Sequence, residues 1–393
     1  MNREQRLLLL TLSDHLQKRS TIPEEGIDWH ALAVLADAHE VAGIVYKQCK
    51  EWIPGQYRSQ FERAYSSALF AYANRRRAYQ EIQVAFAENS IQSITVKGLE
   101  VAALYPIPAL RTMGDLDILV HQQDKERADQ ILIRLGYQTK MKNPNYDWTY
   151  YRDGMEYELH HQMFYIYDKD INDPKQVTFF NDYWPYAKDG QLDWSFHFLY
   201  MLVHLKKHLM LYGAGFRMFF DLAVIMNSGI ILDWPWIEKK LDEFHLCKFA
   251  DVCFGLIEAW FSAEVPINHP RMEIDLLDRL TDRVARDGIF GFDNKNNYAN
   301  VEVNTILKGG EQHWCSRIRV FLRNVFPPYR QIAYVKEYNF LQGKPLLLPV
   351  AWIFRFYRLA AGKTEGLASI MDRIMVSDER VKQRKKELRE WGL

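Results

Sequence analysis

Two aspartates separated by one leucine lie in the run RTMGDLDILV, which extends from Arg111 to Val120. Because side chains alternate along a β-strand, this spacing predicts that Asp115 and Asp117 share one face of a strand. The apolar residues at 118–120 are typical of a strand buried in a sheet. Two neighbouring carboxylates there are costly unless a cation compensates them. A divalent cation carrying a substrate's phosphates would do so, which indicates metal-assisted phosphoryl or nucleotidyl chemistry.

Taken alone, the Asp-x-Asp tripeptide favours a simpler interpretation, a solvated strand end that faces an arginine. The residues upstream change this interpretation. A short β-branched strand ends in Lys97-Gly98 and is followed by a helical segment, Leu99–Tyr105, and a turn that contains two prolines. A glycine at a helix N-terminus can accept an anion. The unit therefore brings an anion site beside Lys97, Arg111 and the two acids.

A hairpin is predicted downstream of this unit. Trp148–Arg152 and Met155–His160 have the composition of strands, and the Asp-Gly turn at 153–154 joins them. In the second strand Glu156, Glu158 and His160 share one face because they are spaced two residues apart.

A third carboxylate on a neighbouring strand is what two-metal nucleotidyl transfer requires, since it helps to hold the second ion and serves as general base toward an acceptor hydroxyl. Glu156 and Glu158 are both candidates for this role, and the alternative for both is a solvent-facing acidic strand edge. His160 and His161 either shape an acceptor site or are structural histidines.

These motifs resemble those of the polymerase-beta-like nucleotidyltransferase superfamily, and most closely its bacterial branch called uncharacterised nucleotidyltransferase. That branch reads Lys-Gly, Tyr-Pro, Arg, a small residue with Asp-x-Asp, and then Glu-Leu-His. The matching residues here are Lys97, Gly98, Tyr105, Pro106, Arg111, Gly114, Asp115, Asp117, Glu158, Leu159 and His160. The family's His-rich helix pattern is matched within Phe196–Met226 by His204, Lys207, His208, Arg217 and Asp221. A looser similarity begins at Phe326.

The resemblance implies transfer of a nucleoside monophosphate from a nucleoside triphosphate to an acceptor hydroxyl, with Mg²⁺ or Mn²⁺ as cofactor and pyrophosphate as product. It implies that Asp115, Asp117 and Glu158 are catalytic and hold the metal. The nucleotide-binding candidates are Lys97, Gly98, Arg111 and Gly114. The candidates that line the cleft are Glu156, His160, His204, Lys207, His208, Arg217 and Asp221. The chain departs from the superfamily's Gly-Gly or Gly-Ser pair at Leu99, which leaves only a backbone N–H for the phosphate.

Several of these residues have alternative interpretations. His204 and His208 are spaced as zinc ligands on one helix face, but the two lysines between them would repel a cation, so a structural or phosphate-contacting role is favoured. Arg217 and Asp221 at i and i+4 fit either a helix salt bridge or the cleft. The run Arg75–Arg77 fits either a phosphate contact or, more commonly, a solvated helix face.

The acceptor class stays open. Aminoglycosides, sugars, proteins and tRNA ends are all used within the superfamily, and the branch's association with polysaccharide gene clusters favours a small or sugar-related acceptor. Abortive-infection toxins that modify tRNA have a similar Lys-Gly and Asp-x-Asp arrangement, and a nucleic-acid acceptor would require a basic groove near the acids. A non-catalytic nucleotide-binding scaffold is the alternative outside enzymes.

Composition adds few constraints. Lys and Arg number 50, as do Asp and Glu, so no overall charge favours nucleic acid or a membrane. The cysteines Cys49, Cys247, Cys253 and Cys315 lack metal-ligand spacing and are expected to be free thiols in a reducing cytoplasm. The apolar N-terminal run is too short for a signal peptide, and Leu346–Phe354 is too short to span a bilayer. We expect a cytoplasmic protein with no transmembrane segment.

The pattern of elements predicts an α+β fold in which a small mixed β-sheet nucleotidyltransferase core is flanked by N-terminal and C-terminal helical regions. The predicted divisions are 1–90, 91–190, 191–290 and 291–393. In the first two, helices are expected at Arg3–Arg19, Asp28–Cys49, Tyr57–Asn89 and Asp124–Leu135. In the third, helices are expected at Trp194–Ser228, Trp234–Phe244, Cys247–Phe261 and Ile274–Asp287.

The last division is expected to open with a polar loop, Asp293–Asn297, followed by helices at Ile318–Phe326 and Arg330–Phe340. The aromatic, amphipathic Pro345–Lys363 is expected to pack on the core, with contact to a membrane surface as the alternative. The basic tail Arg380–Lys386 fits RNA, anionic lipid or a solvated helix equally well.

Overall fold

The computed structural model describes residues 1–142, 147–165, 173–211, 213–288, 303–304, 307, 322–323, 325–333, 335–361 and 378–393. By their internal contacts, residues of the chain form two compact units. One is Met1–Phe292 with Trp391–Leu393, and the other is Asp293–Glu390. The finer division into four regions stays a prediction.

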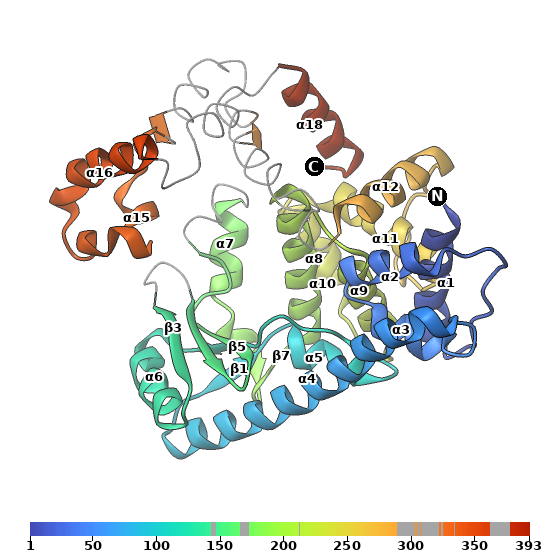
Figure 1. Cartoon of the computed structure of the whole chain (residues 1–393), viewed down its shortest axis with the longest axis horizontal. Helices are drawn as coiled ribbons and strands as arrows, with labels where there is room; N and C mark the ends of the chain where they lie inside the picture. Colours follow the sequence, from blue (N-terminus) through green and yellow to red (C-terminus); the bar gives the residue numbers. More distant parts are fainter. Residues whose placement is uncertain are drawn as a thin grey trace. The chain divides into compact units, whose positions relative to one another are not determined.

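The first unit contains a five-stranded mixed sheet with the strand order β1-β2-β5-β4-β3 (Figure 1). The strands are β1 Ser93–Thr95, β2 Asp117–Val120, β3 Gln138–Lys142, β4 Trp148–Arg152 and β5 Met155–His160. β2 and β5 run parallel, and the other neighbours are antiparallel. Helices precede and follow this sheet in the chain, so the expected α+β class is confirmed.

The two faces of the sheet have different partners. Ile118 and Leu159 point to one face and pack in a core with the end of α4 (Gly55–Glu88) and with α6 (Lys125–Arg134). Leu119 points to the other face and joins the larger core built by the helical part of the unit. Because side chains alternate, Asp117, Glu158 and His160 emerge on this second face.

The N-terminal helices are α1 Arg3–Leu16, α2 Trp29–Ala38, α3 Ala42–Cys49 and α4. Asp28 caps α2 as its spacing predicts, since its carboxylate accepts from the N–H groups of His30 and Ala31. The single helix expected over Asp28–Cys49 is wrong. Glu40 has φ 54, a left-handed conformation that ends one helix before the next begins.

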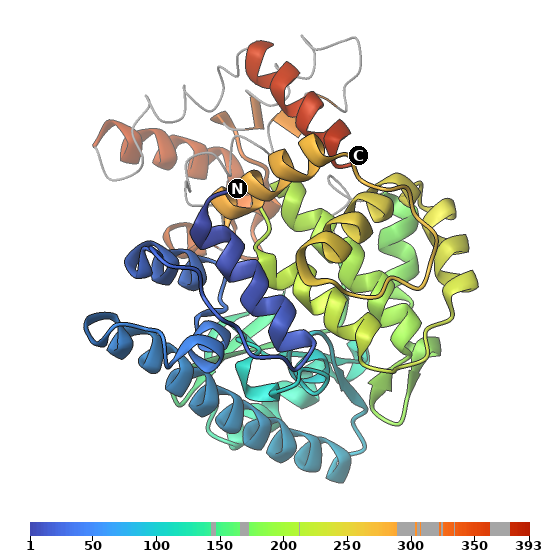
Figure 2. The ribbon, with the colours of Figure 1, turned by 90° about the vertical axis from the view of Figure 1, so that its right-hand side faces the viewer.

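The remaining elements of this unit follow the sheet. They are α7 Pro174–Asn181, the hairpin of β6 Ala187–Lys188 and β7 Gln191–Leu192, α8 Trp194–Leu211, α9 Phe216–Asn227, α10 Trp234–Glu243, α11 Cys247–Phe261 and α12 Ile274–Asp287. The helix expected over Trp194–Ser228 is therefore two helices, and Gly213 at φ 102 lies between them. The helices α1, α9 and α11 pack together (Figure 1; Figure 2).

In the second unit the described elements are α15 Tyr329–Ile332, the 3₁₀-helices η5 Lys336–Leu341 and η6 Pro345–Leu347, α16 Leu348–Ala360 and α18 Asp378–Glu390. The helix expected over Arg330–Phe340 is interrupted, because Val335 has an extended backbone. The predicted loop Asp293–Asn297, most of the predicted helix Ile318–Phe326 and Cys315 lie outside the described residues.

The three described cysteines are free thiols, as expected; Cys49 and Cys253 are buried and Cys247 is exposed. Among the helices that the structure describes, none is long and apolar enough to cross a bilayer.

The break between α2 and α3 buries His39. Its Nε2 lies 3.3 Å from the carbonyl oxygen of Ala285, and its Nδ1 accepts from the N–H of Phe216 at 3.1 Å. Burial lowers the pKa of His39 to about 4, and the Ala285 contact opposes this only in part. The fold therefore requires the neutral imidazole.

We expect the contribution of His39 to the free energy of unfolding to be complete above pH 6.5 and to be lost as the pH falls from 6.5 toward 4, by about 3 kcal/mol in all. Urea unfolding at a series of pH values would measure this loss in the wild type and in His39→Asn, which keeps an acceptor for Phe216. The variant should lose less stability over that window. An exposed control, His30→Asn, should follow the wild type; equal losses in all three proteins would contradict the assignment.

Candidate active site

The backbone register of the two central strands brings two carboxylates together. Asp117 on β2 lies directly opposite Glu158 on β5, and the N–H of Glu158 donates to the carbonyl of Leu116 at 2.9 Å. The Thr95 hydroxyl donates to the Asp117 carbonyl at 2.8 Å, which fixes the start of β2 from the β1 side. The acid pair is therefore set by main-chain pairing and does not depend on a mobile loop.

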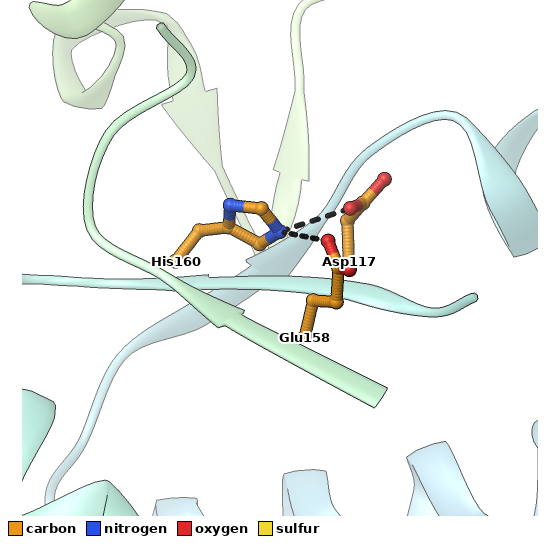
Figure 3. Close-up of side chains that lie close together, drawn as sticks. All are labelled: Asp117, Glu158 and His160. Atoms are coloured by element: carbon orange, nitrogen blue, oxygen red, sulfur yellow. Dashed lines mark hydrogen bonds and ion pairs between the residues drawn. The ribbon is translucent and has the colours of Figure 1, made fainter. Parts of the chain in front are cut away.

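His160 lies between these two carboxylates (Figure 3). Its Nε2 is 2.9 Å from Asp117 Oδ1 and 3.2 Å from Glu158 Oε2, and its Nδ1 is 2.7 Å from the Tyr165 hydroxyl. Burial alone would lower the pKa of His160, but the bonds to Asp117 and Glu158 outweigh it and raise the pKa to about 10. The imidazole is therefore a cation that bridges the two acids.

Lys97 compensates the other oxygen of Asp117. Its Nζ lies 2.7 Å from Asp117 Oδ2. Burial raises the pKa of Asp117, yet Lys97 and His160 together hold that pKa below its usual range. For Glu158 burial dominates and raises the pKa to about 8, against the His160 hydrogen bond. One carboxylate is thus firmly ionised and its neighbour is easily protonated.

The backbone of Lys97 is held in an unusual conformation. Lys97 has φ 59 and ψ −98, which a residue with a side chain rarely adopts. Its N–H donates to Nε2 of His197 on α8 at 2.9 Å, and α5 (Gly98–Ala102) begins at the next residue. The helical part of the unit therefore helps to hold Lys97 in its strained position.

Asp115 lies outside the strand that was expected to carry it, because β2 begins only at Asp117. The charge of Asp117 and burial raise the pKa of Asp115. The preceding carbonyl, that of Gly114, accepts a 2.8 Å hydrogen bond from Arg75 of α4. Arg75 is buried, so the solvated reading of the Arg75–Arg77 run is wrong for its first member, although the other two are exposed.

Arg111 makes a buried bidentate ion pair with Asp221 of α9. Its Nε and Nη2 lie 2.9 Å from the two carboxylate oxygens, and its Nη1 donates to the carbonyl of Gly98 at 3.1 Å. The Tyr105 hydroxyl donates to the same carboxylate at 2.6 Å. Arg217 makes a longer contact with Asp221, at 3.5 Å between Nη1 and Oδ2. Its shorter contact is with Glu40, at 2.9 Å between Nη2 and Oε2. The i, i+4 salt bridge is thus secondary to a contact between residues far apart in sequence.

Two cavities meet at the acids. Both are lined by Lys97, Asp115, Asp117, His204 and His208. One, of about 190 Å³, is also lined by Gly98, Arg111, Gly114, Arg217 and Asp221. The other, of about 390 Å³, is also lined by Glu158, His160 and Lys207. Of the predicted cleft residues Glu156 lines neither cavity; it forms an ion pair with Lys140.

The predicted histidines differ in their surroundings. His204 and His208 have ring centroids 4.6 Å apart, and burial next to Lys97 and Lys207 lowers the pKa of both, that of His208 to about 3. Within the described part of the chain, the residues grouped closely enough to share a metal ion are Asp117, Glu158 and His160, whose ligand atoms lie within 4.8 Å of one another. His161 lies beside Lys125 Nζ, at 3.1 Å.

Some residues that line or support the two cavities are not predicted from the sequence. Glu40 lines the smaller cavity, and Tyr165 and Tyr200 line the larger one. The burial of Arg75 could be predicted from the sequence. It lies at helical spacing from the residues that form the buried stripe of α4, which are Ala78, Tyr79, Ile82 and Phe86. Nothing near Glu40 in the sequence indicates a contact with Arg217.

The model of a family described as uncharacterised nucleotidyltransferase matches residues 25–262. The chain belongs to this family. The matched span includes the sheet, α8 and α9, and therefore every residue that lines the two cavities. The nucleotidyltransferase activity expected from the sequence is thus supported, and the enzyme transfers a phosphorus-containing group. No curated protein and no solved structure matches the chain.

The buried Arg111–Asp221 pair should be essential for the stability of the nucleotidyltransferase. Side chains of both residues are almost fully buried, and removal of one partner from such a pair leaves an uncompensated charge. We expect Asp221→Asn to lower the free energy of unfolding by about 3 to 5 kcal/mol. Chemical denaturation followed by circular dichroism would measure this loss. Glu243→Gln, which breaks an exposed pair with Lys240, is the control and should leave the denaturation midpoint unchanged.

Proposed function

We propose that the enzyme transfers a nucleoside monophosphate group from a nucleoside triphosphate to a hydroxyl of a small acceptor, with Mg²⁺ or Mn²⁺ as cofactor and pyrophosphate as product. The observation that carries this proposal is the direct opposition of Asp117 and Glu158 on the parallel strands β2 and β5, with Asp115 beside them. Membership of the nucleotidyltransferase family supports the reaction class.

The donor set suits a hard divalent cation. Asp115, Asp117 and Glu158 offer carboxylate oxygens, which Mg²⁺ prefers, and His160 would add a nitrogen that Mn²⁺ accepts once the imidazole has released a proton. The site also holds a buried negative charge that a bound cation could offset, because Asp117 is buried and is paired there with the movable cations Lys97 and His160. A cation bound there would offset the charge of the triphosphate and lower the pKa of the acceptor hydroxyl.

Residues of the chain would perform the remaining tasks. Lys97 lies at the junction of the two cavities, so its ammonium group can move from Asp117 toward a phosphate oxygen and stabilise charge on the leaving pyrophosphate. The Gly98 N–H at the start of α5 is a further donor to a phosphate. Glu158, on the side of the larger cavity, would accept the proton of the acceptor hydroxyl.

Arg111 is assigned differently from the role that the resemblance implies. Its guanidinium is committed to Asp221 and to the carbonyl of Gly98. We therefore assign Arg111 as a positioning residue, which fixes the start of α5 against α9. It lines the smaller cavity, so a direct phosphate contact would add to this role.

The size and lining of the cavities favour a small acceptor. The cavity of about 390 Å³ falls within the volume range of small-molecule sites, and Tyr165 and Tyr200 give it aromatic walls. The smaller cavity, beside Gly98 and Gly114, suits the phosphates. We assign the phosphates to the smaller cavity and the acceptor to the larger one. Sugars and related polyhydroxy compounds have the hydroxyl groups that such a pocket would position.

Nucleotide binding should depend on the metal and on the acid pair. A nucleoside triphosphate that binds only the native state should stabilise it by roughly 2.7 kcal/mol at about 100 times its Kd. Thermal unfolding with ATP, GTP, CTP or UTP, with and without Mg²⁺, would measure this effect. The metal-dependent rise in midpoint should disappear in Asp115→Asn/Asp117→Asn. A double variant that binds and turns over like the wild type would refute the assignment.

The third carboxylate can be tested with a matched pair of variants. Glu158→Gln should lower kcat by about 100- to 10,000-fold, because general-base catalysis contributes this much. Glu156→Gln changes the same group two residues away, outside both cavities, and should retain wild-type turnover. Pyrophosphate release with each nucleotide and a panel of sugars, aminoglycosides and tRNA would provide the rates. If Glu156→Gln is the inactive variant, the general base has been misassigned.

A further inference from the structure

The helix α16 in the second unit presents an apolar face to solvent. Leu346, Val350, Ile353 and Tyr357 are spaced by four, three and four residues, so they form one stripe along the η6–α16 segment. They are 92%, 51%, 70% and 62% exposed. Phe354 and Phe356 widen this stripe on its two sides and are also exposed. The opposite face packs inward, where Ala351 is fully buried.

The inward face is well anchored, so the exposure of the stripe does not reflect a loose helix. Ala351 belongs to a small core with Ile332, Tyr338 and Leu341. The indole of Trp352 donates to the carbonyl of Pro327 at 2.9 Å. The sequence predicts that Pro345–Lys363 packs on a core. In the described part of this segment one face does so, and the other face is exposed.

A contiguous exposed patch of large apolar side chains marks a surface that is covered in use. We name the residues Leu346, Val350, Ile353, Phe354, Phe356 and Tyr357 the apolar stripe. In a soluble helix the polar residues would face solvent. Here the two arginines of α16, Arg355 and Arg358, lie on its half-buried side.

The charge around the apolar stripe indicates what covers it. No Asp or Glu occurs between Glu337 and Glu365, whereas four basic residues do: Lys344, Arg355, Arg358 and Lys363. Arg358 pairs with Glu337 at 3.6 Å, and Lys344 is exposed at the start of η6. An exposed apolar face on a segment that carries basic residues and, between Glu337 and Glu365, no acidic one complements an anionic lipid surface, in which apolar side chains enter the acyl boundary and basic ones reach the headgroups.

The second unit as a whole also carries a positive charge. Residues Asp293–Glu390 contain 18 Lys and Arg against 10 Asp and Glu, a formal charge of +8, in a chain whose formal net charge is +0. Basic residues near an anionic leaflet each contribute about 1 kcal/mol to binding. The 13 residues of α16 extend about 20 Å at 1.5 Å per residue, which is too short to cross a bilayer and suits a helix lying in its plane.

We propose that the apolar stripe of α16 docks the enzyme on an anionic membrane surface. This inference does not depend on the proposed reaction, because the stripe belongs to the second unit and no residue of it lines either cavity. RNA is a weaker fit, since a basic surface for RNA does not need six exposed apolar side chains. A second copy of the chain is the competing protein occupant.

The test is co-sedimentation of the full-length protein with sucrose-loaded vesicles of phosphatidylcholine, alone or mixed equally with phosphatidylglycerol. The patch variant is Leu346→Glu/Ile353→Glu. The matched control is Ile231→Glu/Ile274→Glu, which also replaces two aliphatic side chains by glutamate, at residues of the first unit that are 93% and 75% exposed. All four side chains are exposed, so neither variant removes core packing.

The wild type and the control should partition onto vesicles that contain phosphatidylglycerol, more weakly at high salt. The patch variant should partition at least about tenfold less, because a charge is costly at the acyl boundary. Absence of wild-type binding, or equal binding by the patch variant, would overturn the proposal. It would also be overturned if sedimentation velocity without vesicles shows a dimer that the patch variant dissociates, or if the stripe is needed for binding an RNA oligonucleotide and not for vesicles.

Discussion

Compensation of the buried Asp117 carboxylate organises this enzyme. The carboxylate leaves the middle of a sheet on its inner face, where an isolated charge would be unstable. Lys97 binds one oxygen from the end of β1, and His160 binds the other from β5. Each of these cations is itself held in place, Lys97 by His197 of α8 and His160 by Tyr165. The sheet, its edge strand and the helical region are therefore linked through the environment of one acid.

A second buried charge pair performs the same task at the other end of the site. Arg111 follows the turn after α5, and Asp221 lies on α9, 110 positions later in the chain. Their bidentate pair, with Tyr105 and Gly98 attached, fixes α5 against the helical region. Arg75 of α4 holds the Gly114 carbonyl in a comparable way. The loop that carries Asp115 is thus supported from two helices, although it belongs to neither, which keeps both acids in one place when a polyanionic substrate arrives.

The sequence predicts what depends on local chemistry. β4 and β5 have the expected bounds, because alternation and the Asp153-Gly154 turn fix the hairpin; both turn residues have positive φ, as this turn requires. Prediction from the sequence fails where contacts with residues far away in the chain determine the local structure. The break at Glu40 follows from contacts with α9 and α12, and the partner of Arg111 cannot be inferred from residues near it. The spacing of Asp115 predicts that it shares a strand with Asp117, but the register of β2 with β5 begins only at Asp117.

The strained backbone of Lys97 shows what the site requires. A conformation with φ 59 costs about 1 to 3 kcal/mol for a residue with a side chain. Glycine would remove this cost but would leave Asp117 without its nearest cation and would remove the ammonium group that the two cavities share. The main-chain bond to His197 and the ion pair with Asp117 offset the strain. In the proposed mechanism the ion pair would weaken as the ammonium group moves toward a phosphate, and the His197 bond would hold the backbone during that movement. The acceptor suits this task, because His197 of α8 is fully buried and its lowered pKa keeps the imidazole neutral.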